Sequence, residues 1–151
     1  MSDLELSSPE FSHGEEIPRK FGYTEENVNP PLDISGVPSK TQSMALVMDD
    51  PDAVEPAGKV WDHWVVWNIE PNTSQIGEDE KPPGAVEGKN DYGERGYGGP
   101  NPPDKRHTYK FKLYALDRNI DLPPKSTKHD LEKEMEGHVI AKTVLEGTYA
   151  P

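Results

Sequence analysis

The sequence predicts a single, mainly β domain, a sandwich of β-sheets that carries one helix. Three segments have the pattern of buried strands, over residues 43–48, 62–69 and 107–116. The chain also contains 16 Pro and 13 Gly, which break helices and form tight turns. Only one segment, near the C-terminus, has a helical period. With 151 residues, the whole chain, residues 1–151, has the length of one domain.

The first two predicted strands have apolar residues on both faces, which is typical of strands inside a sheet. Residues 43–48 form a nearly continuous apolar run that ends in an acidic turn, Asp49–Asp52. Along residues 62–69, strict alternation places His63, Val65, Trp67 and Ile69 on one face and Trp64, Val66 and Asn68 on the other. Both segments are therefore expected to be inner strands.

The third strand and the helix have clear periods. Alternation over residues 107–116 predicts one face formed by His107, Tyr109, Phe111, Leu113 and Ala115. Thr127 and Asp130 then have the spacing of a capping box. Apolar residues recur at four-residue intervals after it: Leu131, Met135 and Val139. We expect this helix to be followed by a last short strand, Thr143 to Tyr149.

Two long segments have the composition of loops. Residues 7–38 are rich in Pro, Gly, Glu and Asn, and their short apolar pieces predict brief strands. Residues 70–106 are rich in proline and glycine and have no helical period. A loop of that length is uncommon in a compact domain and is usually functional. Part of the functional site is therefore expected there.

The charge of the chain excludes several classes of partner. The formal net charge is −12, from 28 acidic and 16 basic residues. Such a chain repels nucleic acid and anionic membranes, so neither is an expected partner. A phosphate-type ligand must therefore be held in a local pocket, against the overall field. The absence of cysteine excludes disulfides and thiolate chemistry.

The sequence also predicts a soluble, cytoplasmic protein. Its first residues lack the basic region and apolar stretch of a signal peptide. No apolar run reaches the 18 residues that a membrane-spanning helix needs.

Two candidate functional segments lie at strand ends. In Asp49–Asp52, clustered carboxylates are suited to a divalent cation or to positioning a histidine, whereas the alternative is a simple acidic turn. In Trp61–Trp64, the histidine lies between tryptophans. His63 is either a core histidine bonded to a backbone carbonyl or a donor at the floor of an apolar pocket.

The third candidate segment is the loop from Arg95 to Pro103, followed by His107 and Tyr109. Glycines let a backbone approach a ligand closely, and prolines stiffen it in that position. His107 and Tyr109 are two residues apart on a strand, so both side chains project to the same side and both can donate to an oxyanion. The alternative is a surface loop that precedes a strand.

Three ordered motifs resemble those of the phosphatidylethanolamine-binding protein (PEBP) family, which includes the Raf kinase inhibitor protein. They are Asp50–Ala53, Trp61–Trp64, and Gly99–Pro103 followed by His107–Tyr109. The ending, from Gly137–His138 to Gly147–Tyr149, is similar to the compact bacterial and archaeal branch. The resemblance covers residues 17–149.

This resemblance implies a large central antiparallel sheet packed on a smaller sheet, with one or two peripheral helices. It also implies a surface pocket for phosphate, phosphoethanolamine or a similar small anion. Carried onto this sequence, the ligand-binding residues are Asp50, His63, Pro102, Pro103, His107 and Tyr109. The supporting positions are Asp52, Trp61 and Gly99.

Two departures limit what the resemblance implies. The family usually has a proline directly after Asp-Pro-Asp-Ala, where this chain has Val54, so the course of that loop is open. Eukaryotic members carry a C-terminal helix near the pocket, whereas this chain ends at Pro151. The kinase-regulating activity of those members is therefore not transferred to this chain.

We expect a binding protein that uses no metal or cofactor. The two histidines and Tyr109 would donate hydrogen bonds to the anion, and binding would weaken as the pH rises above ~6.5, the ordinary pKa of histidine. An enzyme is not expected, because the chain has no Cys and no Gly-x-Ser-x-Gly nucleophile motif. Metal-assisted hydrolysis through Asp50, Asp52, His63 and His107 is the enzymatic alternative.

Two associations remain open at this stage. One is a protein partner, such as a kinase or protease, that is regulated in a pocket-dependent way. The other is a homodimer, which the compact relatives often form.

Overall fold

The structure, a computed structural model, describes residues 3–151 and has two antiparallel sheets with short helices. The five-stranded sheet has the order β6 (Val86–Glu87), β4 (Trp61–Ile69), β3 (Ser43–Asp50), β7 (His107–Leu116), β8 (Val139–Tyr149). The three-stranded sheet has the order β1 (Glu5–Ser7), β2 (Leu32–Ser35), β5 (Gln75–Ile76). This arrangement confirms the predicted fold class of a large antiparallel sheet packed on a smaller one.

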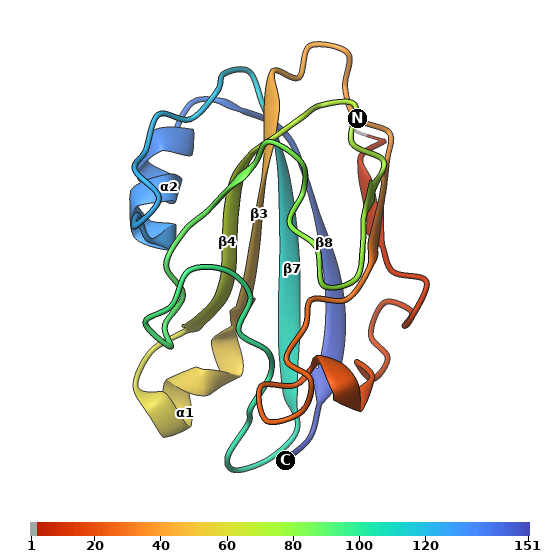
Figure 1. The fold of residues 1–151 in the computed structure, drawn as a ribbon, viewed down its shortest axis with the longest axis vertical. Helices are drawn as coiled ribbons and strands as arrows, with labels where there is room; N and C mark the ends of the chain where they lie inside the picture. The colour runs from red at the N-terminus through yellow and green to blue at the C-terminus, as the bar shows by residue number, and fades with distance from the viewer. Residues whose placement is uncertain (1–2) are drawn as a thin grey trace.

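The helices are short and peripheral. Within residues 3–151, the α-helices are α1 (Val54–Ala57) and α2 (Lys128–Met135), and 3₁₀ turns span Arg19–Phe21 and Pro51–Ala53. Figure 1 shows α2 on one side of the five-stranded sheet and the N-terminal strands on the other. None of the helices within residues 3–151 is long and apolar enough to cross a membrane.

The predicted inner strands lie at the centre of the large sheet. All eight residues of β3 are buried, and β3 pairs with β4 on one side and with β7 on the other. The strand extends two residues further than the apolar run, because Asp49 and Asp50 still pair with β4. The acidic turn therefore begins only at Pro51, where the Asp50 carboxylate accepts a hydrogen bond from the Asp52 N–H and caps the 3₁₀ turn.

The predicted C-terminal helix is shorter than its apolar period. The Thr127–Asp130 capping box is present, but α2 ends at Met135. Gly137 then adopts φ 78°, a left-handed conformation that commonly follows the end of a helix. Val139 was expected on the helix but is the first residue of β8, which pairs with β7 and is longer than the predicted final strand.

Two apolar clusters hold the layers together. The larger one lies between the two sheets and includes Leu6, Phe21, Leu32, Trp64, Phe111 and Leu145. The smaller one lies between the large sheet and α2 and includes Val47, Val65, Trp67, Leu131 and Met135. On β7, the predicted face of Tyr109, Phe111, Leu113 and Ala115 belongs to the larger cluster, as the alternation indicated.

Two irregularities in β4 break its predicted alternation. Met48 pairs with Trp64 but Asp49 pairs with Asp62, so His63 is an extra residue in a β-bulge. A second shift near Asn68, which has φ 57°, moves Ile69 into the larger cluster with Trp64. The prediction that His63 and Ile69 share a face with Val65 and Trp67 is therefore wrong. His63 contacts Tyr109 instead, at a ring-centroid distance of 5.2 Å.

Candidate functional site

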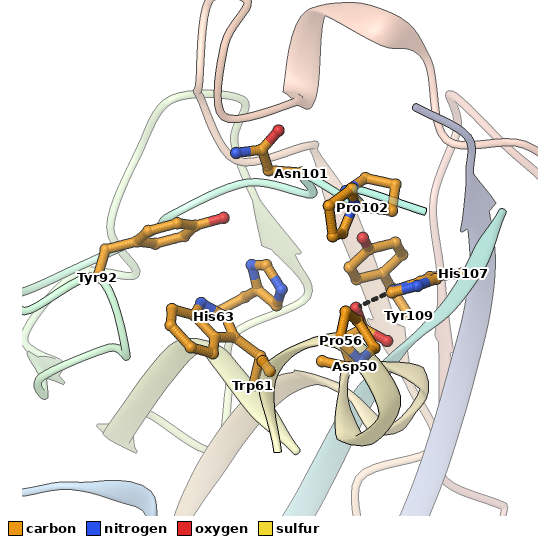
Figure 2. A pocket seen from close by; sticks show the side chains of 12 residues that line it. Asp50, Pro56, Trp61, His63, Tyr92, Asn101, Pro102, His107 and Tyr109 are labelled. Carbon is orange, nitrogen blue, oxygen red and sulfur yellow. Dashed lines mark hydrogen bonds and ion pairs between the residues drawn. The ribbon is translucent and has the colours of Figure 1, made fainter. Parts of the chain in front are cut away.

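A pocket of about 180 Å³ lies at the end of the molecule where β3 ends and β4 and β7 begin. Its walls come from these strand ends, from α1 and from the loop that precedes β7 (Figure 2). The structure brings all six predicted ligand-binding residues into this pocket: Asp50, His63, Pro102, Pro103, His107 and Tyr109. Asp50 and His107, 57 positions apart in the sequence, thus meet at one place.

The three predicted supporting residues have different positions. Trp61 itself lines the pocket. The Asp52 carboxylate lies outside and accepts a hydrogen bond from the Thr108 N–H at 2.8 Å, which ties the 3₁₀ turn to the start of β7. Gly99 also lies outside the pocket. A Cβ there would collide with the backbone carbonyl of Phe21, so the close approach of the two segments requires glycine.

Several pocket residues were not predicted from the sequence, and of these Tyr92 and Asn101 are polar. Tyr92 stacks on Tyr23 at a centroid distance of 3.8 Å, and its hydroxyl donates to the Gly99 carbonyl at 2.8 Å. The Tyr92 ring also meets the edge of His63. Asn101 belongs to the Gly99–Pro103 motif. Nothing in the sequence around Tyr92 indicated that this tyrosine would reach the pocket. Its ring contacts, with Tyr23, Trp61 and His63, all join it to residues distant in the sequence.

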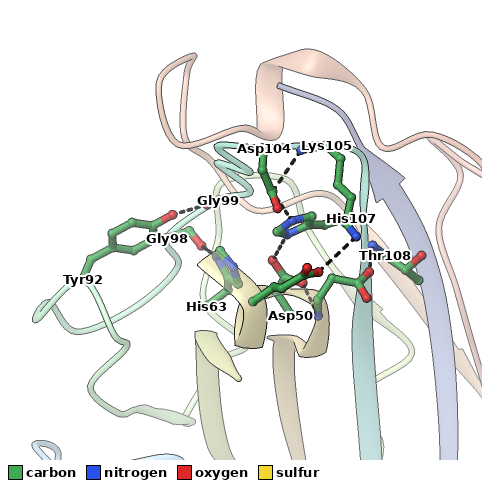
Figure 3. Close-up of polar contacts among 11 residues, drawn as sticks. Asp50, His63, Tyr92, Gly98, Gly99, Asp104, Lys105, His107 and Thr108 are labelled. Atoms are coloured by element: carbon green, nitrogen blue, oxygen red, sulfur yellow. Dashed lines mark hydrogen bonds and ion pairs between the residues drawn. The ribbon is translucent and has the colours of Figure 1, made fainter. Parts of the chain in front are cut away.

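His107 is held between two carboxylates (Figure 3). Its Nδ1 lies 2.6 Å from Asp50 Oδ2, and its Nε2 lies 2.7 Å from Asp104 Oδ1. Ionised carboxylates only accept hydrogen bonds, so both ring nitrogens donate and the ring is a cation. Burial lowers the pKa of His107, but the bonds to Asp50 and Asp104 outweigh burial and raise the pKa above its ordinary value.

The contact with Asp104 changes the predicted role of His107. From the sequence, His107 was expected to be a free donor for a ligand, yet both N–H groups of its ring are already bonded in this structure. Asp104 was not predicted to take part. Its side chain is 37% exposed and comes from the loop, whereas that of Asp50 is 4% exposed.

His63 has the opposite charge state. Its Nδ1 lies 2.7 Å from the Gly98 carbonyl, which can only accept, so Nδ1 carries the proton. Burial lowers the pKa of His63 to about 4, although the carbonyls of Gly98 and Gly99 act in the other direction. At neutral pH the ring is therefore neutral and its Nε2 is an acceptor. Figure 2 shows the ring in the middle of the pocket wall.

His63 was expected to be either a core histidine or a donor at the floor of a pocket, and each interpretation is correct in part. The ring is buried and bonded to a backbone carbonyl, as expected of a core histidine. The same ring also lines the pocket. The expectation that it donates to an anion does not fit a neutral ring whose only proton is bonded to Gly98.

Two further polar groups of the pocket residues are buried without an ordinary hydrogen bond. Among residues 3–151, the Tyr109 hydroxyl and the Trp61 indole N–H have no partner of good geometry. Burial raises the pKa of Tyr109, and the nearby Asp50 carboxylate raises it further, so the phenol keeps its proton. The backbone of Asn101 and the side chain of Asp50 are both close enough to act on this pKa, but neither forms a well-aligned bond with the hydroxyl. Such groups are costly to bury unless a ligand or water satisfies them.

The carboxylates of the pocket bond to groups of the protein itself. Burial raises the pKa of Asp50, while the bond to His107 opposes this shift. Within residues 3–151, no group of three or more His, Asp or Glu side chains is arranged to hold a metal ion. The acidic residues instead hold the imidazolium of His107 and cap the neighbouring turn.

Comparison with known proteins identifies a family. A family model described as phosphatidylethanolamine-binding protein matches residues 7–150. A UPF0098 protein of the archaeon Methanothermobacter thermautotrophicus is 42% identical over 151 residues, covering 97% of this chain and 98% of the relative. A UPF0098 protein of Chlamydia muridarum is 41% identical over 149 residues, with the same coverages.

Solved structures have the same fold. A phosphatidylethanolamine-binding protein homologue from Chlamydia trachomatis matches with a TM-score of 0.91 at 39% identity, covering 99% of this chain and 98% of that one. YbcL of E. coli, described as a member of the mammalian PEBP family, matches with a TM-score of 0.90 at 32% identity, covering 98% of each chain. A Plasmodium vivax protein, at 13% identity and a TM-score of 0.61, is similar in fold alone.

Proposed function

Because the chain belongs to the phosphatidylethanolamine-binding protein family, we propose that its pocket binds a small oxyanion, such as phosphate or the phosphate group of phosphoethanolamine. The observation that carries the proposal is the combination of groups in the pocket. A cationic His107 and the unbonded hydroxyl of Tyr109 line one cavity in a chain whose net charge is −12. A local site of this kind can hold an anion that the rest of the surface repels.

The hydrogen bonds that would hold the anion follow from the states of these groups. The Tyr109 hydroxyl donates to one oxygen, and the His107 Nε2–H donates to another when Asp104 does not occupy it. A charge-assisted bond of this kind contributes ~1.5–3 kcal/mol. Pro102 and Pro103 form a stiff wall that needs no ordering when the ligand enters.

His63 adds a requirement on the ligand. Its Nε2 is an acceptor at neutral pH, so an anion without a proton would place a lone pair against a lone pair. An oxyanion that keeps at least one proton, such as dihydrogen phosphate or a singly ionised phosphate monoester, can donate a proton to Nε2. The pH dependence of binding then follows His107, whose raised pKa moves the loss of affinity above the ordinary value of histidine.

We propose binding without catalysis. No cysteine is present, and the polar pocket side chains are an acid, two phenols, an amide, an indole and two histidines whose N–H groups are all bonded within the protein. No group there is activated as a nucleophile. Regulation of a protein partner, a homodimer and a cytoplasmic location stay predictions of the sequence.

Calorimetric titration of phosphate and phosphoethanolamine at pH 6 tests the proposal. Wild type should bind, and His107→Ala should lose most of the affinity because it removes the cation. Tyr109→Phe, which keeps the ring and removes only the hydroxyl, should weaken binding about tenfold. The control is His129→Ala on the exposed face of α2, which should bind like wild type. Absence of binding to folded wild type would refute the proposed function.

A further inference from the structure

We propose that Asp104 is an internal competitor for this pocket, and that an oxyanion binds by displacing the Asp104 carboxylate from His107. The inference rests on the proposed function and adds a mode of regulation to it. In the structure, the Asp104 carboxylate accepts the hydrogen bond from His107 Nε2–H that a ligand would otherwise accept.

The geometry leaves His107 with no spare donor. An imidazolium has two N–H groups. One is 2.6 Å from Asp50 Oδ2 and the other is 2.7 Å from Asp104 Oδ1. A ligand that bonds to His107 must therefore take the place of one of the two carboxylates.

Only Asp104 is free to leave. The Asp50 side chain is 4% exposed, and its second oxygen caps the Pro51–Ala53 turn through the Asp52 N–H. The Asp104 side chain is 37% exposed and lies on a loop. Its remaining hydrogen bond is a local one, from the N–H of Lys105. Displacing Asp104 thus costs few contacts.

The loop has fixed points on both sides of Asp104. Pro102 and Pro103 stiffen the chain before it. After it, the Thr108 N–H is held by the Asp52 carboxylate at 2.8 Å. Between these points, Lys105 forms an ion pair with Glu55 of α1 at 3.3 Å, and Arg106 donates to the Thr148 hydroxyl of β8 at 3.1 Å. Both contacts are exposed, and exposed pairs contribute little, so only weak interactions hold the segment in place.

The charge balance favours exchange over simple addition. Asp50 and Asp104 already place two carboxylates on the single positive charge of His107. An anion that entered beside both would add a third negative charge to a poorly solvated site. An anion that replaces Asp104 leaves the local charge unchanged. The tethered carboxylate also competes at high effective concentration, so it lowers the apparent affinity for any free anion.

The experiment compares inorganic phosphate binding by calorimetry at pH 6 for wild type, Asp104→Ala and Asp104→Asn. Asp104→Ala should bind phosphate about tenfold more tightly or better, because the competing charge-assisted bond is gone. Asp104→Asn keeps the shape but loses the charge, and its affinity should lie between the two. The control is Glu55→Gln, which removes the negative charge that pairs with Lys105 and leaves the hydrogen bonds of His107 in place. It should change the affinity by less than about twofold.

The outcomes separate this inference from the proposed function. Tighter binding by both Asp104 variants, with Glu55→Gln unchanged, supports displacement. Equal or weaker binding by the Asp104 variants, while wild type binds, overturns displacement and leaves the anion site standing. Equal gains in all three variants would show a general charge effect and would also overturn it. If no folded variant binds, the anion site itself is wrong. Repeating the series with phosphoethanolamine distinguishes a headgroup ligand from free phosphate.

Discussion

At the scale of single residues, the pocket depends on two histidines with opposite charge states. His63 is neutral because it is buried against a backbone carbonyl, and His107 is a cation because two carboxylates hold it. The site therefore offers one acceptor and, once Asp104 moves, one charged donor. A ligand must match both groups.

The first prediction follows from the acceptor. At pH 6 wild type should bind phosphate about tenfold more tightly than sulfate, because dihydrogen phosphate can donate a proton to His63 Nε2 and sulfate has none. Competition calorimetry at equal ionic strength measures the ratio. Equal affinities for the two anions would contradict the assignment of His63 as an acceptor.

Sequence patterns predicted the identity of the pocket residues better than their contacts. The six predicted ligand-binding residues all line the pocket, because motifs at strand ends report which side chains gather there. The bond between His107 and Asp104 was not predictable, since it depends on how the loop turns before β7. Tyr92 was missed because its stacking on Tyr23 joins loops that are distant in sequence.

At the scale of elements, a bulge in β4 positions His63. Regular alternation would direct this side chain to the side of Val65 and Trp67, under α2. The extra residue at the bulge places it beside Tyr109 instead. A two-residue period carries no sign of such a bulge, and this explains why the predicted faces of β4 failed while those of β7 held.

The helix α2 contributes no residue to the pocket lining, although Lys128 at its start forms ion pairs with Asp49 and Asp62, which lie next to pocket residues in the chain. A change in its cap tests whether the helix and the site are independent. In Figure 1 α2 lies near the opposite end of the sheet from α1, which lines the pocket. Thr127→Ala removes the cap and should lower the free energy of unfolding by about 1 kcal/mol, measured by urea denaturation. Thr127→Ser should restore most of it. Phosphate affinity should stay the same in both variants, and a change would contradict the separation of helix and site.

At the scale of the whole molecule, the three central strands of the large sheet were predictable, whereas the two-residue strands β5 and β6 were not. β3, β4 and β7 have eight to ten residues each, enough for a period to appear. The strands β5 and β6 have two residues each and lie in the segment expected to be a loop. Their pairing depends on neighbours already in place. Val139 continued the four-residue spacing of α2 by coincidence and belongs to β8.

The two pocket histidines also affect the stability of the whole fold in opposite directions. His63 has a folded pKa of about 4 and an ordinary value of 6.5, so the unfolded chain binds more protons between these values. Its contribution is present above about pH 6.5 and is lost as the pH falls towards 4. His107 has a raised folded pKa, so its contribution is present below 6.5 and is lost as the pH rises through the folded value.

Urea denaturation at pH 4.5 and 6.5 tests the contribution of His63. Wild type should lose about 2 kcal/mol more of its free energy of unfolding over this interval than His63→Gln, which cannot titrate. All carboxylates are common to both proteins, so the difference isolates this ring. Equal losses in the two proteins would mean that His63 is not held neutral.

The central claim, that one pocket with a neutral His63 and a cationic His107 binds a small oxyanion, is tested most directly by the ¹⁵N signals of the histidine rings. A long-range ¹H–¹⁵N spectrum at pH 6 should show His63 protonated at Nδ1 only and His107 protonated at both nitrogens. On titration with inorganic phosphate, these two rings should shift and saturate together. His13, His129 and His138 lie outside the pocket and serve as internal controls. Phosphate binding that leaves the signals of His63 and His107 unchanged would contradict the account.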